Sequence, residues 1–315
     1  MTISSHLQEL YGLPRAYFPD ADTQPTAELP EAGSVAWLVM VDAYESDESW
    51  ESAFARFLDS VDSTEVRSLI VGSWSDAYES GPDEVVEAIV AASDRLPSLR
   101  ALFVGDMTYE QCEISWINQT AMAPLINALP QLHSFGVRGG QDLDMTGIKH
   151  EGLRSLTVET GGLDAGVVRS IAAAELPALE HLDIWLGTSW YGANTVVADL
   201  EPFLSGERLP ALTSLALRNS EIQDEIAAAM AGAPVVARLE TLDLSMGTLG
   251  DEGVEALLSG QPLTHLKKLD LHHHYMSKPM EDRLRATLEP AGVVLDLSEG
   301  GPLSDRDSRY TAVAE

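Results

Sequence analysis

The sequence predicts an α/β solenoid of about 9–10 repeats, with a parallel sheet on the concave face, helices on the convex face and right-handed connections. The main observation is a repeated phrase: an apolar residue, two variable residues, Leu, one variable residue and a second apolar residue. A strand-plus-helix unit cannot bury its apolar face alone, so such units stack. Clear copies are Leu99-Leu102-Val104, Leu153-Leu156-Val158, Leu179-Leu182-Ile184, Leu212-Leu215-Leu217, Leu239-Leu242-Leu244 and Leu266-Leu269-Leu271. Weaker copies are Val35-Leu38-Met40, Val66-Leu69-Val71 and Leu132-Phe135-Val137, with a remnant at Leu295-Leu297.

The second observation is the spacing of these copies, because most steps of 26 to 33 residues leave room for a helix after each strand. Each helix would return the chain so that the next strand lies parallel to the last. Apolar residues on one helical face support this prediction in most intervals. They are Trp50, Phe54, Phe57 and Leu58; Val85, Val86, Ile89 and Val90; Val167, Val168 and Ile171; Val196, Val197, Leu200 and Leu204; Val254, Leu257 and Leu258; and Met280, Leu284 and Leu288.

One step is shorter than the others. Only 21 residues separate Leu132 from Leu153, which is too few for a strand, a helix and two turns. The polar, glycine-rich residues 139–147 therefore predict a loop and a local change in curvature. This loop is either a degenerate repeat or a binding loop.

The two ends of the chain lie outside the repeated phrase. Residues 1–33 contain apolar side chains between Leu7 and Phe18 and are predicted to cap the first repeat. Residues 34–298 form the predicted solenoid. Residues 299–315 carry little to bury and are predicted to be disordered.

Charge is the strongest feature of the composition. The 315 residues include 50 acidic and 19 basic ones, for a net charge of −31, which disfavours nucleic acid and favours a basic protein, a basic peptide or another cation. Acidity that serves only solubility is the alternative. A single cysteine, Cys112, excludes an intrachain disulfide and favours the cytoplasm. We see no secretion signal and no apolar run long enough for a membrane span.

Residues 239–258 and 153–171 carry the clearest repeats, and they resemble the leucine-rich-repeat superfamily in its long, ribonuclease-inhibitor-like class. The chain also loosely resembles an uncharacterised bacterial leucine-rich-repeat family. The resemblance covers Val35 to Leu297 and implies a partner-binding concave sheet without catalysis, although no set of functional residues carries over. The family usually has Asn or Cys eight residues after the first Leu. Several repeats here have Gly instead, which predicts a turn with positive φ at Gly140, Gly161, Gly187 and Gly247.

Alternation along each strand predicts which side chains line the concave face. Asp243, Asp270 and Asp296 would stand on consecutive strands, and Asp183 two strands before Asp243. Carboxylates this close repel one another, so they favour a bound cation or a basic partner. The alternative is that Lys268, His181 and Arg218, or water, neutralise them. Further partner-binding candidates are Trp185, Arg218 and His272 beside this row and, on the next loop, Trp190 and Tyr191, which could also pack against a neighbouring repeat.

The first repeats predict a second, apolar patch on the concave face. It would be an interface if exposed and ordinary core if covered by residues 7–18. Its residues are Trp37, Val39, Val41, Ile70 and Phe103.

Candidates for catalysis are few. His272, His273 and His274 suggest a zinc or nickel site beside Asp243 and Asp270, but alternate strand residues point to opposite faces and His274 should enter the turn. We therefore predict no catalytic residue, metal or cofactor. The predicted function is a non-catalytic module that binds a basic or peptide-like partner. The alternative is a metal-holding enzyme, or an accessory protein that binds a small molecule or peptide in a modification pathway.

Overall fold

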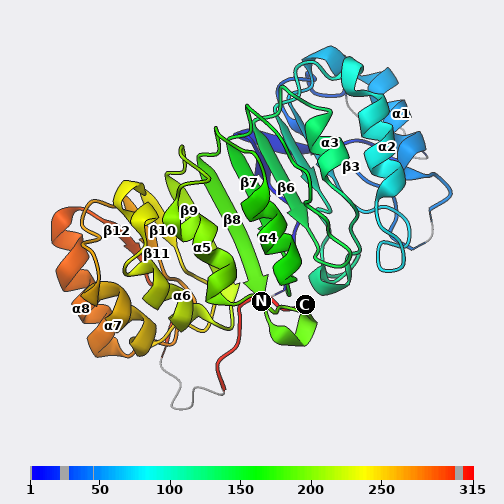
Figure 1. Cartoon of the computed structure of the whole chain (residues 1–315). Coiled ribbons are helices and arrows are strands. Elements are labelled where there is room, and N and C mark those ends of the chain that lie inside the picture. The colour runs from blue at the N-terminus through cyan, green and yellow to red at the C-terminus, as the bar shows by residue number, and fades with distance from the viewer. Residues whose placement is uncertain (1, 22–27, 45, 302–307) are drawn as a thin grey trace. The chain divides into compact units, whose positions relative to one another are not determined.

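The computed structural model describes residues 2–21, 28–44, 46–301 and 308–315. They form two compact units: an N-terminal unit of residues 2–159 and 174–176, and a C-terminal unit of residues 160–173 and 177–314. Both units are α/β, and their mostly parallel strands follow one another in chain order, which is consistent with a repeat solenoid (Figure 1). Within the described part of the chain, every helix is too short or too polar to span a bilayer.

Seven strands occur among the described residues of the N-terminal unit. Its first two strands pair antiparallel and the later ones pair parallel with their predecessors. The strands are β1 (Glu9–Leu10), β2 (Leu13–Tyr17), β3 (Ala36–Val39), β4 (Ser68–Val71), β5 (Ala101–Val104), β6 (Ser134–Arg138) and β7 (Ser155–Glu159). The helices are α1 (Trp50–Ser60), α2 (Asp83–Ala91) and α3 (Ala123–Asn127), with short 3-10 helices η1 (Ser63–Glu65), η2 (Ser93–Arg95) and η3 (Ile114–Trp116).

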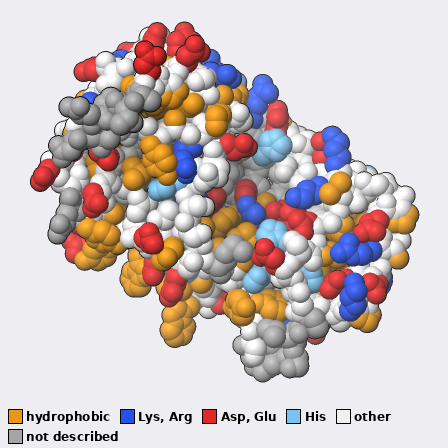
Figure 2. Space-filling view, turned by 180° about the vertical axis from the view of Figure 1, so that it is seen from behind, with side chains coloured by type: hydrophobic (Ala, Val, Ile, Leu, Met, Phe, Trp, Pro, Cys, Tyr) orange, Lys and Arg blue, Asp and Glu red, His pale blue; other side chains and the backbone are white. Residues whose placement is uncertain are grey.

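The C-terminal unit alternates helices and parallel strands. The strands are β8 (His181–Gly187), β9 (Ser214–Ser220), β10 (Thr241–Asp243), β11 (Lys268–Asp270) and β12 (Val294–Asp296). The helices are α4 (Ala165–Ala173), α5 (Val197–Ser205), α6 (Gln223–Met230), α7 (Asp251–Ser259) and α8 (Lys278–Leu288), with 3-10 helices η4 (Ser189–Tyr191), η5 (Pro234–Arg238) and η6 (Glu289–Ala291). Seen from the side opposite to Figure 1, acidic, basic and histidine side chains are interspersed over this unit (Figure 2).

The leucines of the repeated phrase form the core beneath the helices. Leu102, Leu215, Leu242 and Leu269 are fully buried. The six predicted helical faces all occur in helices, although Val196 lies just before α5 and is exposed. The sequence analysis named no apolar face for α3 or α6, yet Leu125 and Ile126 of α3 and Ile226 and Met230 of α6 are buried.

The register of the first repeat differs from the expected one by one residue. Trp37 pairs with Leu69, and Leu38 pairs with Ile70, so Trp37 and Val39 point to the helices. The Trp37 ring lies 5.6 Å from Phe57 of α1. Leu38 instead takes the predicted place of Val39 beside Ile70 and Phe103. We call the side of each sheet opposite to its helices the helix-free face.

Residues near the N-terminus cover the helix-free face of β3–β5. Leu7, Leu10, Leu13 and Met40 pack on a buried cluster of Ala36, Leu38, Ile70 and Phe103. The predicted apolar patch is therefore core, because the chain's own residues cover it. Beyond this contact, β2 pairs with β3 and extends the sheet. Residues 22–27, also part of the predicted cap, lie outside the described residues.

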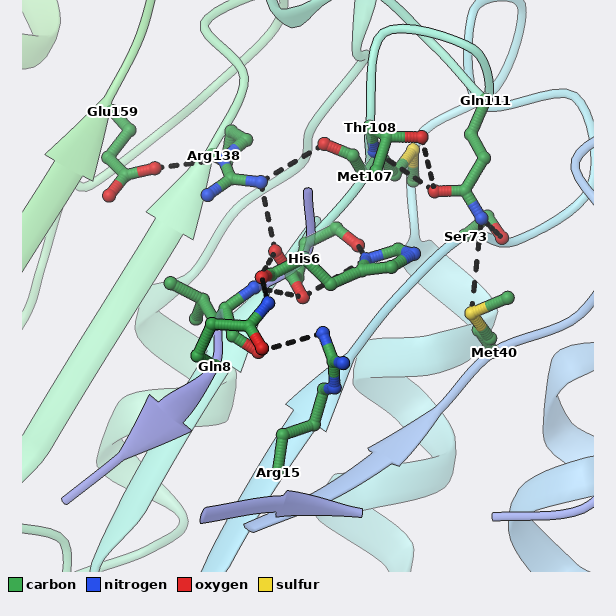
Figure 3. Close-up of polar contacts among 12 residues, drawn as sticks. His6, Gln8, Arg15, Met40, Ser73, Met107, Thr108, Gln111, Arg138 and Glu159 are labelled. Atoms are coloured by element: carbon green, nitrogen blue, oxygen red, sulfur yellow. Dashed lines mark hydrogen bonds and ion pairs between the residues drawn. The ribbon is translucent and has the colours of Figure 1, made fainter. Parts of the chain in front are cut away.

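A buried polar network holds this covering segment in place (Figure 3). Asp106 is fully buried and accepts hydrogen bonds from the Leu7 backbone N–H and from Arg138 Nη1, at 3.1 and 2.9 Å. His6 Nδ1 lies 3.2 Å from the same carboxylate, and Arg138 Nε donates to Glu159 at 2.8 Å. A buried carboxylate needs such partners, so the Asp106 carboxylate links the N-terminal covering segment to the sheet, and each stabilises the other.

The expected loop follows β6. Residues 139–154 contain no helix, and bridges join Gln141 to Asn118 and Asp144 to Ala121. The 21-residue step thus replaces the helix of a normal repeat with a loop of turns and isolated bridges.

The chain after Glu299 differs from the expected disordered tail. Residues 302–307 lie outside the described residues, but Ala312 and Val313 are buried in the C-terminal unit. Asn219 Nδ2 donates to the Val313 carbonyl at 2.7 Å, and the Val313 N–H donates back to Asn219 at 3.0 Å. Arg309 donates to Asp224 at 3.1 Å. Few apolar side chains are needed here, because backbone hydrogen bonds and one ion pair hold the segment.

The turns after the strands also differ from expectation. Gly187 has the predicted positive φ of 77°, but Gly140, Gly161 and Gly247 do not. In three later repeats the left-handed residue stands one position earlier and is not glycine: Asn219, Met246 and His273, with φ of 55°, 66° and 53°.

Candidate partner-binding surface

The predicted row of aspartates lies in register on the helix-free face of β8–β12. Asp183 pairs with Ala216 of β9, which pairs with Asp243 of β10. Asp243 pairs with Asp270, and Asp270 pairs with Asp296. Leu242 and Leu269, which directly precede Asp243 and Asp270 on their strands, are buried beneath the helices, so alternation points the aspartates to the opposite face. We call this surface the C-terminal face.

Arg218 joins the first two aspartates of the row. It donates from Nε and Nη2 to the two carboxylate oxygens of Asp183, at 2.9 and 2.6 Å. Its Nη1 lies 3.5 Å from Asp243 Oδ2. The guanidinium also stacks over the Trp185 ring at 5.1 Å, and Trp185 is only 7% exposed. One arginine therefore compensates two carboxylates, and Trp185 acts as a stacking platform rather than an exposed anchor.

A second charge cluster surrounds Asp270. His272 Nδ1 donates to Asp270 Oδ1 at 2.7 Å, and Lys268 Nζ donates to Oδ2 at 2.8 Å. Burial opposes the negative charge, but these hydrogen bonds outweigh it and hold the pKa of Asp270 well below its ordinary value. The same hydrogen bond raises the pKa of His272 against partial burial. The face is thus a set of paired charges, with Arg218 and Lys268 in their expected neutralising roles.

His181 and Asp296 have other partners. His181, which was expected to neutralise the row, lies 4.0 Å from Glu180, which is not part of the row. Asp296 accepts hydrogen bonds from the backbone N–H and hydroxyl of Ser298, which lower its pKa.

The one group of potential metal ligands within the described ranges is Asp270, His272 and Asp296, which offer atoms within 4.8 Å of one another. Both oxygens of Asp270 already accept hydrogen bonds, so a metal ion there would compete with the positive charge of Lys268. His274 does not join this group, because it is buried and its Nε2 lies 3.2 Å from the Leu297 carbonyl.

Trp190 and Tyr191 lie in η4, just after β8. Trp190 is 86% exposed, the most of any large apolar side chain in the part of the chain described. Its loop is anchored by Glu221, which accepts hydrogen bonds from the Thr188 hydroxyl and the Ser189 N–H. An exposed tryptophan on a fixed loop is a suitable anchor for a partner.

The sequence analysis missed one contributor to this face. Met246 Sδ lies 3.6 Å from Arg218 Nη1 and helps to hold the guanidinium. The sequence predicts that Met246 lies in the turn after β10, but it does not predict the left-handed backbone of this residue.

The comparisons with known proteins support the fold. No protein-family model matches the chain, and no curated protein matches it. A crystallised protein of Bacteroides fragilis is 26% identical, with a TM-score of 0.77 over 85% of this chain and 74% of that one. The Toll–Spätzle complex of Drosophila is 16% identical over 85% of this chain and 32% of that one, with a TM-score of 0.40. A Listeria monocytogenes internalin is 14% identical over 88% and 84%, with a TM-score of 0.32. Only the first superposition is close enough to indicate a shared fold.

Proposed function

We propose that this protein is a non-catalytic interaction module, a leucine-rich-repeat solenoid of the ribonuclease-inhibitor-like class, that binds a basic or peptide-like protein through its C-terminal face. The repeated phrase, the parallel strands in chain order and the helices between them support the repeat class. The single buried Cys112 agrees with a reducing compartment such as the cytoplasm.

The observation that carries the proposal is the contrast between the two helix-free faces. In the N-terminal unit, the chain's own residues 7–13 cover Ile70 and Phe103. On the C-terminal face, the side chains of Asp183, Arg218 and His272 are 25%, 19% and 24% exposed. Partly exposed, preorganised charges on a rigid sheet are what a partner can recognise.

The charge balance of the C-terminal face favours a basic partner. Asp183, Asp243, Asp270 and Asp296 carry four negative charges against the positive charges of Arg218 and Lys268 and, when protonated, of His272. The chain's net charge of −31 would steer a cationic partner to it and repel a polyanion.

Charge reversal tests the proposal. Native lysate is first passed over the immobilised chain, and the captured partner is then titrated into purified variants. The double variant Asp243→Lys with Asp270→Lys should lose most of its affinity, whereas a matched reversal on the helical side, Glu201→Lys with Glu207→Lys, should not. Circular dichroism and Asp243→Asn alone guard against misfolding, since Asp270 is mostly buried. Equal affinity in all variants would discard this face.

A second candidate function follows from the grouping of Asp270, His272 and Asp296. If the protein is a metal-holding enzyme, tag-free protein should contain about one equivalent of zinc or nickel that His272→Ala removes. We expect no stoichiometric metal. A purely structural scaffold would show neither metal nor a saturable partner.

A further inference from the structure

Three consecutive loops of the N-terminal unit expose aromatic side chains, a feature that the sequence analysis did not use. Tyr44 follows β3, Tyr78 follows β4, and Tyr109 and Trp116 follow β5. These four side chains are 63%, 55%, 44% and 52% exposed. Large aromatic side chains gathered on loops in this way are typical of binding surfaces.

The four aromatic residues line one pocket of about 210 Å³. Gln111, Cys112 and Glu113 complete it, together with two alanines. Gln111 is held on both sides: its Oε1 accepts from the Thr108 N–H at 3.0 Å, and its Nε2 donates to Ser73 Oγ at 3.3 Å (Figure 3). Burial raises the pKa of the Cys112 thiol to about 11, so it stays neutral at physiological pH. The pocket therefore has a fixed floor without a reactive thiolate.

The walls of the pocket are tied to acidic residues. The Tyr78 hydroxyl donates to Glu79 at 2.7 Å, and the Tyr109 hydroxyl lies 3.4 Å from Glu110. The loop residues 40–48, 72–82 and 105–117 contain no Lys, Arg or His, and of their acidic residues Glu113 lines the pocket, whereas Asp106 and Glu48 are paired with Arg138 and Arg56. The pocket thus combines aromatic faces with negative charge, and none of its lining residues is basic.

We propose that this pocket binds an arginine side chain of a partner protein. A guanidinium is flat, stacks on tyrosine and tryptophan, and donates hydrogen bonds to carboxylates such as that of Glu113. The chain uses this combination itself, because Arg309 stacks 5.9 Å over Tyr275 while paired with Asp224, and Arg218 does the same with Trp185 and Asp183. This site lies in the N-terminal unit and does not depend on the proposed function of the C-terminal face.

Calorimetric titration of the full chain with a capped Gly-Arg-Gly peptide tests the proposal. We expect saturable 1:1 binding that weakens with added salt. Trp116→Ala and Glu113→Gln should each weaken it at least about tenfold. Tyr310→Ala, which changes an exposed aromatic side chain of the other unit, is the matched control and should bind like the unaltered chain. The aromatic and acidic side chains that are changed are exposed or line the pocket, and thermal unfolding checks that each variant is folded.

Several results would overturn the proposal. They are no binding of the arginine peptide, equal binding to the Trp116→Ala variant, or equal binding of a norleucine peptide, which would make the pocket merely apolar. Equal binding of a lysine peptide would overturn the assignment to guanidinium. The variant with Asp243→Lys and Asp270→Lys should keep the Trp116-dependent binding, so failure of one site is distinguishable from failure of the other.

Discussion

At the scale of single residues, two arginines show how burial sets the cost of breaking an ion pair. Arg138 bridges Asp106 and Glu159 with its side chain only 4% exposed, and Arg218 bridges Asp183 and Asp243 with its side chain 19% exposed. Breaking a buried pair costs about 3–5 kcal/mol, whereas an exposed pair contributes about 0–1 kcal/mol. Arg138 is therefore structural. The pair of Arg218 with Asp183 is more exposed, so an incoming cation can take the place of Arg218 beside this carboxylate at a lower cost in free energy.

His272 carries a pH-dependent contribution to stability. Its pKa is raised in the folded state by the hydrogen bond to Asp270, so folding binds its proton more tightly. The resulting stabilisation is fully present below the pKa of an unfolded histidine, near 6.5, and is lost as pH rises through the folded pKa. Urea unfolding at pH 6 and pH 8.5 should show His272→Gln to be more destabilising at pH 6. A gap that widens at pH 8.5 would contradict this sign.

At the scale of elements, two terminal segments pack against their own units. Residues 7–13 cover the helix-free face of β3–β5, and residues 308–314 lie along the turns after β9–β11. In the second case the Ala312 N–H donates to the Met246 carbonyl at 2.7 Å, and the Tyr275 hydroxyl donates to the Tyr310 carbonyl at 2.9 Å. Both segments contribute to stability although neither belongs to a repeat.

Removal of residues 308–315 should destabilise the protein. Truncation exposes the sites of Ala312 and Val313 and leaves Asp224 without Arg309, so we expect a loss of about 2–4 kcal/mol in the free energy of unfolding. Urea unfolding of the truncated and full chains measures this loss. Tyr310→Ala, which changes an exposed ring in the same segment, should cost much less. Unchanged stability after truncation would show that the segment is dispensable.

At the scale of the whole molecule, the charge excess dominates. A net charge of −31 repels itself within a compact chain, and dissolved salt screens that repulsion. We expect the midpoint of thermal unfolding to rise between 0.05 and 0.5 M sodium chloride. Because acids outnumber bases by 50 to 19, weakened ion pairs should not outweigh the screened repulsion. A midpoint that falls with salt would indicate that ion pairs dominate instead.

The repeat pattern predicted most of the fold, and it failed at an identifiable place. Residues 35–40 are all apolar, because both faces of β3 are buried. Without polar alternation, nothing in the sequence distinguishes Trp37 from Leu38 as the inward residue, and the predicted register slipped by one. The exposed aromatic pocket was missed for a different reason, since Tyr44, Tyr78 and Tyr109 lie in loops whose own sequences are not repeated.

The sequence by itself determined the succession of strands and helices, the inward leucines and the row from Asp183 to Asp296, because alternation along a strand and the recurrence of one short phrase are local properties of the sequence. Only the tertiary structure decided which charges pair and which faces are covered. Asp106 meets His6 across 100 residues, and Val313 meets Asn219 across 94. Contacts between residues so far apart in the sequence depend on how each unit packs, and a periodic sequence pattern does not predict them.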